Sequence, residues 1–201
     1  MIKAPLVKPA YVAIISQRRS GLREKCAEIL SSRQAIIWEV GCGHGHFLTA
    51  YAADHPDQLC IGIDIVADRI ERAERKCRRA RLTNLHFLHA DAYDFLASLP
   101  EEARFSAVYM LFPDPWPKRR HHKNRLLQAK FLHAIAQKAG PGTPFRFRTD
   151  FEPYFGEARA TFAAHPDWTL QPEASWPFEL PTIFQQKAAR YHSLVAECRR
   201  H

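Results

Sequence analysis

Apolar runs of strand length alternate with amphipathic stretches of helix length along most of this chain, and this alternation limits the fold more than any other feature. The expected strands cover residues 35–40, 59–63, 85–89, 107–112 and 145–148, and the expected helices cover residues 46–53, 67–81, 92–99, 126–138 and 153–164. Strands that alternate with helices form parallel sheets that are covered on both faces. The pattern therefore predicts an α/β fold with a doubly wound, mostly parallel sheet.

The composition is that of one folded domain with a basic surface. Hydrophobic residues make up 46% of the 201 residues and charged residues 25%, which are ordinary values for a globular domain of this length. The net charge of +8 favours an anionic partner. No apolar run approaches the roughly 18 residues of a membrane-spanning helix, and no signal-peptide cleavage site follows the N-terminus. We therefore expect a cytoplasmic protein that does not enter a membrane.

No metal site is expected from the cysteines and histidines. The five cysteines are spread along the chain without a C-x-x-C pair, which argues against a disulfide framework and against a structural zinc site. Two histidine pairs, His44 with His46 and His121 with His122, have no acid or thiol nearby at ligand spacing.

A glycine-rich segment, W-E-V-G-C-G-H-G, joins the first expected strand to the first expected helix. Gly41 and Gly43 allow a tight turn and the close approach of a ligand at the helix N-terminus. Three acids follow strands in the same way: Glu39 ends the first strand, Asp64 the second, and Asp91 the third. An acid at the end of the second strand can accept hydrogen bonds from both ribose hydroxyls of an adenosine. These residues predict a site for an adenosine-containing cofactor.

Two cofactors suit such a site, a nicotinamide dinucleotide and S-adenosylmethionine. The dinucleotide fingerprint G-x-G-x-x-G is present only in part, and Glu39 beneath the loop would repel a pyrophosphate. The same carboxylate suits the ammonium group of a methionine moiety. The pattern thus favours S-adenosylmethionine, although Asp91 can also be explained as a helix N-cap.

The run L-F-P-D-P-W-P-K-R-R-H-H-K-N-R, residues 111–125, joins an acid to a block of cations. Asp114 lies between two prolines, which restrict its backbone, at the carboxyl end of the expected strand 107–112. Trp116 offers a flat apolar surface next to it. The block that follows contains no acid and holds Lys118, Arg119, Arg120, Lys123 and Arg125. A cation block of this kind is typical of phosphate binding, although it also occurs on an ordinary solvated surface.

These segments resemble the tRNA (guanine-N7-)-methyltransferase family. The resemblance covers residues 35–192 and is strongest in F-P-D-P-W-P-K-R-R-H-H-K at 112–123, in W-E-V-G-C-G-H-G at 38–45 and in R-T-D-F-E-P-Y at 148–154. It implies a Rossmann-like fold of the class I S-adenosylmethionine-dependent methyltransferases. It also implies methyl transfer from S-adenosylmethionine to N7 of a guanine in the variable loop of tRNA. A monomer or homodimer is implied, and a further protein partner is left open.

The resemblance also assigns roles to individual residues. Asp114 is implied as the catalytic residue. The residues implied to bind the cofactor are Glu39, Gly41, Gly43, Asp64, Asp91 and Asp114. Those implied to contact the target nucleoside are Lys118, Asp150, Thr182 and Gln185. Those implied to contact RNA are Arg120, His121, His122, Lys123, Asn124 and Arg125.

One motif departs from the family. Where the family has T-K-F-E, this chain has T-I-F-Q, with Ile183 and Gln185 in place of the lysine and the glutamate. A carboxylate accepts two hydrogen bonds from the Watson–Crick edge of guanine, whereas the amide of Gln185 offers one acceptor. Two alternatives therefore stay open, a methyltransferase of another RNA or small molecule and a non-catalytic RNA-binding relative. The four acids retained at positions 39, 64, 91 and 114 argue against the second.

The expected organisation is a single methyltransferase domain over residues 1–201. Residues 1–33 form an N-terminal arm or helix, and residues 34–164 form the cofactor-binding core. Residues 165–201 contain four prolines between positions 166 and 181, which predicts an irregular substrate loop, followed by a closing strand within residues 188–200.

Overall fold

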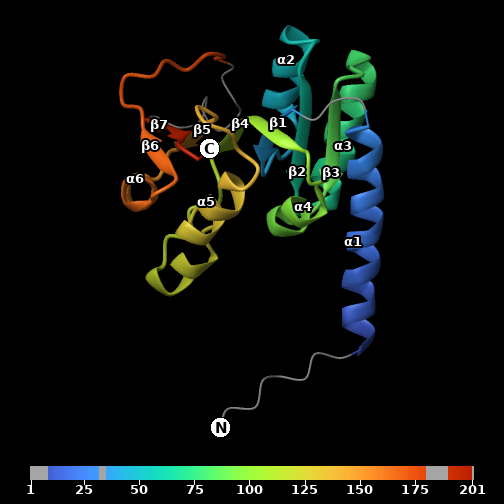
Figure 1. The fold of residues 1–201 in the computed structure, drawn as a ribbon, viewed down its shortest axis with the longest axis horizontal. Coiled ribbons are helices and arrows are strands. Elements are labelled where there is room, and N and C mark those ends of the chain that lie inside the picture. The colour runs from blue at the N-terminus through green and yellow to red at the C-terminus, as the bar shows by residue number, and fades with distance from the viewer. Residues whose placement is uncertain (1–8, 32–34, 180–189, 201) are drawn as a thin grey trace.

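The computed structural model describes residues 9–31, 35–179 and 190–200. Within these residues one seven-stranded sheet runs in the order β3-β2-β1-β4-β5-β7-β6 (Figure 1). The strands are β1 (Ala35–Val40), β2 (Leu59–Asp64), β3 (Leu85–His89), β4 (Arg104–Leu111), β5 (Pro144–Thr149), β6 (Trp168–Leu170) and β7 (His192–Cys198). The helices are α1 (Pro9–Ile29), α2 (His46–Asp54), α3 (Ala67–Ala80), α4 (Ala92–Ser98), α5 (Ala129–Ala136), α6 (Glu152–Ala164) and the short 3₁₀ helix η1 (Arg119–Asn124).

The five strands from β1 to β5 pair in parallel, and β7 pairs antiparallel with both β5 and β6. The predicted doubly wound, mostly parallel sheet is thus confirmed. The strand order reverses between β1 and β4, which are hydrogen-bonded neighbours. In open α/β sheets, ligands bind at the carboxyl ends of the strands beside such a reversal.

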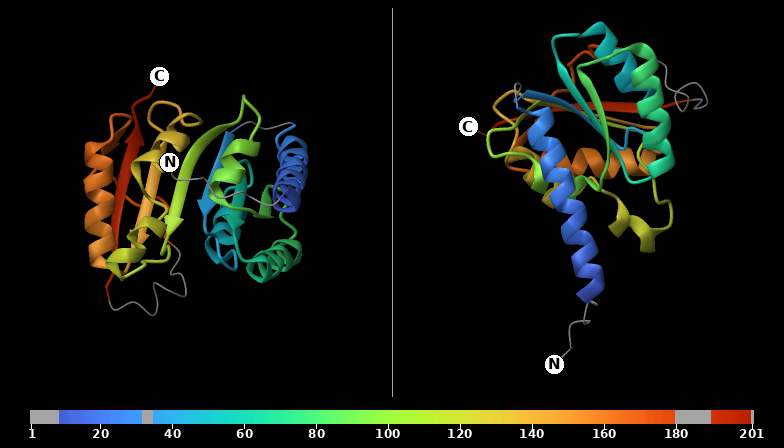
Figure 2. Two further views of the ribbon diagram at one scale, coloured as in Figure 1. Left: turned by 90° about the horizontal axis from the view of Figure 1, so that it is seen from below. Right: turned by 90° about the vertical axis from the view of Figure 1, so that its right-hand side faces the viewer.

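Two hydrophobic clusters lie on opposite faces of the sheet. The larger cluster packs α4, α5, α6 and the end of α1 against one face, with Trp38 at its centre. The smaller cluster packs α2 and α3 against the other face around Tyr109. Figure 2 shows the helices on both sides of the sheet. The alternation along β1 produces this division, because Ile36 and Trp38 join the first cluster and Ile37 joins the second.

Helix α1 occupies the predicted N-terminal arm or helix. The buried Cys26 anchors its C-terminal end, and an ion pair from Arg19 to Asp94 at 2.7 Å attaches its middle to α4. The remainder of the helix projects beyond the body of the protein (Figures 1 and 2). In the part of the chain that the structure describes, no helix combines the length and the apolar character needed to cross a membrane.

The expected elements are all present, although several ends are shifted, β4 begins three residues earlier than expected, and one short strand is additional. The helix expected over residues 126–138 begins only at Ala129, because Leu127 enters the core from an extended segment and donates its N–H to the Tyr154 hydroxyl. The irregular loop expected after residue 165 contains the strand β6. Its three residues pair with β7 and are too few to show a period of two in the sequence. The predicted closing strand is confirmed as β7.

Candidate active site

The glycine-rich loop between β1 and α2 passes three times through the left-handed backbone region. Gly41, Gly43 and Gly45 have φ angles of 71°, 54° and 66°, which favour glycine. A Cβ atom added at Gly41 or Gly43 would meet no atom within 4 Å, whereas one added at Gly45 would overlap the Phe87 ring. The first two glycines therefore leave open space beside the loop, and the third allows the loop to pack against β3.

Asp64, at the end of β2, orients the glycine-rich loop. Its carboxylate is 4% exposed and accepts hydrogen bonds from the N–H groups of Gly43 at 3.0 Å and Val66 at 2.8 Å. The Arg69 guanidinium lies 3.5 Å from the same carboxylate. A ligand hydroxyl that bonds to Asp64 would therefore meet a carboxylate that is already fixed in place.

Asp91 caps helix α4, as the alternative explanation of this residue proposed. Its Oδ1 atom accepts hydrogen bonds from the N–H groups of Tyr93 at 2.8 Å and Asp94 at 3.4 Å. Both bonds use the same oxygen, and the side chain is exposed, so its second oxygen stays accessible to a ligand. Capping and ligand binding are therefore compatible at this residue.

Glu39 is a buried acid at the end of β1. Its side chain is 3% exposed, and one carboxyl oxygen, Oε2, has no hydrogen-bond partner among the described residues. The pKa of Glu39 is raised from 4.5 to about 8, chiefly because burial disfavours the charged carboxylate. The neighbouring Asp64 also raises the pKa, whereas a hydrogen bond from the Leu48 backbone and the charge of Lys76 lower it. The carboxyl group is therefore mostly protonated at pH 7.

Replacing Glu39 with glutamine should make the stability of the fold less sensitive to a rise in pH from 5 to 8. Because the pKa of Glu39 is raised in the fold, the wild-type protein loses stability as the pH rises from 4.5 to about 8. The glutamine in Glu39→Gln does not titrate, so this variant does not lose that stability. The difference in free energy of unfolding between the variant and the wild type should therefore shift in favour of the variant by up to about 4 kcal/mol from pH 5 to pH 8. Urea unfolding at several pH values measures this difference. Glu24→Gln, at an exposed position on α1, is the control, and parallel curves for wild type and Glu39→Gln would contradict the prediction.

A cavity of about 260 Å³ opens at the carboxyl ends of β1, β2 and β4. Four of the predicted cofactor residues, Gly41, Asp64, Asp91 and Asp114, line it together. Glu39 and Gly43 are not part of its wall, because Glu39 lies beneath the loop and the Gly43 N–H is bonded to Asp64. The other lining residues that concern the site are Ile65, Arg69, Phe112, Trp116, Asn124, Leu126 and Tyr154.

Asp114 lies in a strained turn at the rim of this cavity. Phe112 and Trp116 flank the Pro-Asp-Pro segment with φ angles of 50° and 44°, which are unusual for bulky residues. The turn is tied to β5 by a 2.7 Å hydrogen bond from the Phe112 N–H to the Arg148 carbonyl. The Asp114 carboxylate is exposed and, among the described residues, makes no hydrogen bond or ion pair. It is therefore free to contact a substrate.

Arg125 does not belong to the exposed cation block, which corrects the prediction that it contacts RNA. Its side chain is 1% exposed and forms an ion pair with Glu157 of α6. It donates to the carbonyls of Pro115 at 2.8 Å and Trp116 at 3.4 Å, and it lies over the Tyr154 ring at 4.7 Å. A buried guanidinium with these partners holds the Asp114 turn and cannot reach a phosphate.

The remaining predicted contacts fall into three groups. Lys118, Arg120, Lys123 and Asn124 are exposed in or beside η1, while His121 is half-buried against Trp116 and His122 contacts Glu157 at 2.9 Å. Asp150 is exposed just beyond β5 but does not line the cavity. Thr182, Gln185 and the departing Ile183 lie outside the described residues.

Helix α3 carries six cations, and several of them are paired within the helix. Arg72, Arg75 and Arg78 form ion pairs with acids one turn away, at 3.0, 4.0 and 3.7 Å. Lys76 donates to the His44 carbonyl at 2.8 Å and so supports the glycine-rich loop. These contacts indicate that much of the α3 charge forms an ordinary solvated surface.

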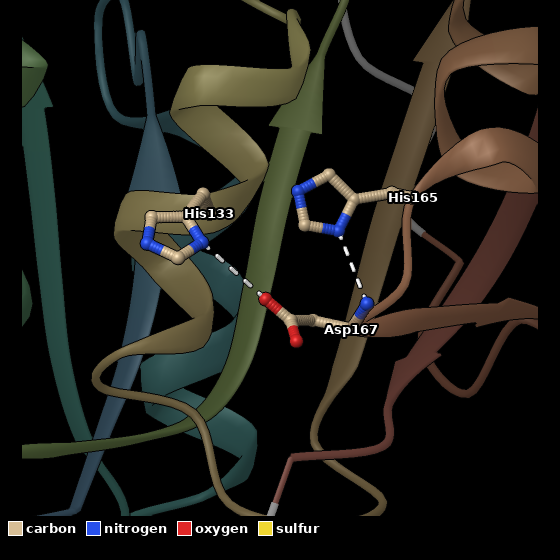
Figure 3. Close-up of side chains that lie close together, drawn as sticks. All are labelled: His133, His165 and Asp167. Atoms are coloured by element: carbon tan, nitrogen blue, oxygen red, sulfur yellow. Dashed lines mark hydrogen bonds and ion pairs between the residues drawn. The ribbon is translucent and has the colours of Figure 1, made fainter.

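A second group of ligand-type side chains lies away from the cavity, between α5 and β6. His133, His165 and Asp167 offer atoms that lie within 4.8 Å of one another (Figure 3). However, His165 accepts the Asp167 N–H at Nδ1 and contacts the Ala129 carbonyl at Nε2, at 3.2 and 3.1 Å. Both of its nitrogens are occupied, so this group acts as a structural brace for the turn before β6.

Four of the apolar cavity residues were not predicted as site residues. Ile65 follows Asp64 directly and is 68% exposed at the cavity wall. At this position the sequence shows only an apolar residue after an acid, which does not identify a site residue. Tyr154 comes from α6, far along the chain, and Leu126 and Phe112 were assigned to regular elements. Tertiary packing brings them to the cavity.

Comparison with known proteins places this arrangement among methyltransferases. A family model described as "Putative methyltransferase" matches residues 33–198. A protein of Hyphomonas neptunium called tRNA (guanine-N(7)-)-methyltransferase is 36% identical over 76% of this chain and 74% of its own length. A protein of the same name from Treponema pallidum is 34% identical over 76% of this chain, which spans only 61% of that relative.

Solved structures agree in fold. The aminoglycoside resistance methyltransferase NpmB1 superposes with a TM-score of 0.59 at 21% identity, over 88% of this chain and 93% of that one. The 16S rRNA methyltransferase KamB superposes with a TM-score of 0.60 at 18% identity, over 86% and 91% of the two chains. These likenesses show that the chain shares the fold of these two proteins, in agreement with the predicted α/β fold.

Proposed function

The chain belongs to the tRNA (guanine-N(7)-)-methyltransferase family, and we propose that it transfers a methyl group from S-adenosylmethionine to N7 of a guanine in tRNA. The observation that carries this proposal is the position of Asp114. Its carboxylate, which has no partner among the described residues, stands at the rim of a cavity lined by Gly41, Asp64 and Asp91, and an exposed block of cations begins four residues later. A reacting methyl group and a polyanionic substrate would meet there.

The cavity suits S-adenosylmethionine by the chemistry of its donors. Asp64 would accept hydrogen bonds from the ribose hydroxyls, and Asp91 would accept one from the adenine amino group through its free oxygen. The exposed Ile65 offers an apolar surface to the base. Oε2 of Glu39, which has no hydrogen-bond partner among the described residues, would accept a hydrogen bond from an ammonium group, and the positive charge of that group would favour the ionised carboxylate. When bound, S-adenosylmethionine supplies an electrophilic methyl group on a positively charged sulfur.

The reaction needs alignment and charge stabilisation from the protein rather than proton transfer. N7 of guanine carries an unprotonated lone pair, so no general base has to remove a proton first. Holding the reacting atoms in line contributes several kcal/mol to lowering the barrier. Methylation at N7 leaves a positive charge on the base, and the Asp114 carboxylate stabilises that charge as it develops. Lys118, Asp150, Thr182 and Gln185 are the proposed contacts of the target nucleoside.

The proposed tRNA surface is the exposed part of the cation block. Lys118, Arg119, Arg120 and Lys123 have exposed side chains on or beside η1. His121, His122 and Asn124 complete this surface. The ion pair between Arg125 and Glu157 attaches this segment to α6. In this proposal residues 1–201 act as one methyltransferase domain in the cytoplasm, as a monomer or homodimer.

The decisive test is methyl transfer from S-adenosylmethionine to unmodified tRNA. The product is digested to nucleosides and compared by mass spectrometry with a 7-methylguanosine standard. Appearance of 7-methylguanosine supports the proposal and shows that Gln185 suffices where the family has a glutamate. Cofactor binding without 7-methylguanosine would direct attention to the T-I-F-Q segment and to another RNA or small molecule as the substrate. No binding and no transfer would favour a non-catalytic relative.

The salt dependence of tRNA binding should separate Lys123 from Arg125. Lys123→Gln removes an exposed cation, so the slope of log affinity against log salt should flatten by about 0.7 to 0.9 if that cation neutralises one phosphate. Arg125→Gln should instead lower the melting temperature, because it leaves Glu157 and two carbonyls without their buried partner. Filter binding at several salt concentrations measures the slope. Arg104→Gln, at the amino end of β4, is the control, and an unchanged slope for Lys123→Gln would remove this residue from the RNA surface.

A further inference from the structure

Arg148 occupies an unusual place near the carboxyl end of β5. Its side chain is 5% exposed, although its formal charge would ordinarily keep it at the surface. In the sheet it pairs with Leu111 at the end of β4 and with Ser193 on β7. Its own carbonyl accepts the Phe112 N–H at 2.7 Å. The backbone of Arg148 thus fixes the start of the turn that carries Asp114.

The guanidinium of Arg148 is bound to a different segment, the loop of residues 171–179. Two of its nitrogens donate to the two carboxylate oxygens of Glu179, at 3.0 and 2.8 Å. Its Nε donates to the Ser193 hydroxyl at 2.8 Å. This bidentate geometry is the strong and directional form of an arginine–carboxylate pair.

Two aromatic rings pack against the same guanidinium. Arg148 lies 3.8 Å from the centre of the Trp176 ring and 4.9 Å from that of Tyr191. Tyr191 in turn contacts Phe112 edge to face at 6.1 Å. Cation–π contacts of this kind are stronger when they are shielded from water, as they are here. One side chain therefore connects β7, the loop and the surroundings of the Asp114 turn.

The loop itself is anchored a second time by apolar packing. Phe178 contacts Phe47 and Tyr51 of α2 at 5.8 and 5.4 Å, and Trp176 contacts Tyr109 of β4 at 6.2 Å. This packing holds the loop as far as Phe178. The pair of Glu179 with Arg148 then ties the last described residue of the loop to β5.

We propose that Arg148 is a positioning residue for substrate binding, which aligns the end of the 171–179 loop with the Asp114 turn. This inference rests on the proposed function. Asp150, a proposed substrate contact, follows Arg148 by two residues, and the Arg148 carbonyl holds the start of the Asp114 turn. Arg148 thereby joins the 171–179 loop to two segments that carry proposed substrate contacts, while its side chain takes no part in the cofactor cavity. Loss of the pair should weaken tRNA binding and leave cofactor binding intact.

The test compares Glu179→Gln with Glu173→Gln. Glu179→Gln breaks the bidentate pair from its exposed side, so the fold should persist, and Glu173→Gln alters an exposed acid of the same loop. For Glu179→Gln we expect KM for tRNA to rise roughly tenfold with a smaller change in kcat. Amide hydrogen exchange should accelerate in peptides that cover residues 171–179, and the affinity for S-adenosylhomocysteine should not change. Arg148→Lys should show the same pattern, because an ammonium group cannot make two parallel bonds.

Two readouts separate this inference from the proposed function. Unchanged exchange and unchanged KM in Glu179→Gln would overturn the positioning role. Equal losses of tRNA and S-adenosylhomocysteine binding in Arg148→Lys would also overturn it, because they would indicate a general structural role. If the wild-type protein methylates no tRNA, the proposed function fails, whereas the exchange measurement still decides whether the pair orders the loop.

Discussion

Asp114→Ala is expected to lower turnover roughly 100-fold or more while the protein keeps its fold. The carboxylate is exposed and, within the described part of the chain, makes no hydrogen bond or ion pair whose loss would destabilise the turn. The turn is held by other groups, namely the bond from Phe112 to Arg148 and the two bonds that Arg125 donates. The methyl-transfer assay gives kcat, and thermal unfolding gives the stability. A large loss of turnover with an unchanged melting temperature is the expected result.

A conservative variant separates charge from shape at this position. Asp114→Asn keeps the size of the side chain and one acceptor but removes the negative charge, so it should lose nearly as much turnover if charge stabilisation dominates. Glu102→Gln, an exposed acid at the amino end of β4, is the matched control at the opposite end of the same strand. Wild-type turnover in Asp114→Ala would refute the catalytic role.

The parts of the site that sequence reasoning found are those whose residues are close together in the chain. The strand, the glycine-rich loop and the following helix lie within about twenty residues, so their spacing alone places Gly41 at a helix N-terminus beside a strand end. Asp64 and Asp91 follow from the same rule, because each ends or follows a buried parallel strand. Such positions are set by backbone geometry, which the alternation of strands and helices already encodes.

The burial of Arg125 shows where this reasoning stops. In the sequence it is the last cation of a basic block, and nothing adjacent distinguishes it from Lys123. The difference comes from Glu157, which lies 32 residues away on α6, and from the Tyr154 ring one turn before it. A long-range ion pair decides between a phosphate contact and a structural support, and a single sequence does not display that pair.

The loop of residues 171–179 illustrates a related limit. Its prolines predict an irregular segment, but they do not predict which surface the segment covers. Trp176 and Phe178 take it across to the α2 side of the sheet, where both pack against the smaller hydrophobic cluster. Because either face of the sheet could accept two aromatic rings, the path of the loop follows only from the assembled structure.

Replacing Asp64 should remove cofactor binding more completely than any other single change in the cavity wall. The carboxylate lines the cavity, is 4% exposed and already bonds the Gly43 N–H, so it serves both the ligand and the loop that faces the ligand. Charge-assisted hydrogen bonds contribute about 1.5–3 kcal/mol each. Removal of one or two of them predicts a fall in affinity of roughly 100-fold for S-adenosylhomocysteine in Asp64→Asn, measured by titration calorimetry.

The control for Asp64 is Asp68, a nearby acid outside the cavity wall. Asp68 also pairs with an arginine, at 3.0 Å, but it lies on the exposed surface of α3 and outside the cavity wall, so Asp68→Asn should bind normally. Asp64→Asn keeps one oxygen that can accept a hydrogen bond from the Val66 or Gly43 N–H. Its melting temperature should therefore change little, whereas its affinity for S-adenosylhomocysteine should fall strongly. Retained affinity in a folded Asp64→Asn protein would mean that the cavity holds its ligand in another orientation, with the ribose away from β2. Asp91, at the end of the next strand, would then be the first acid to test.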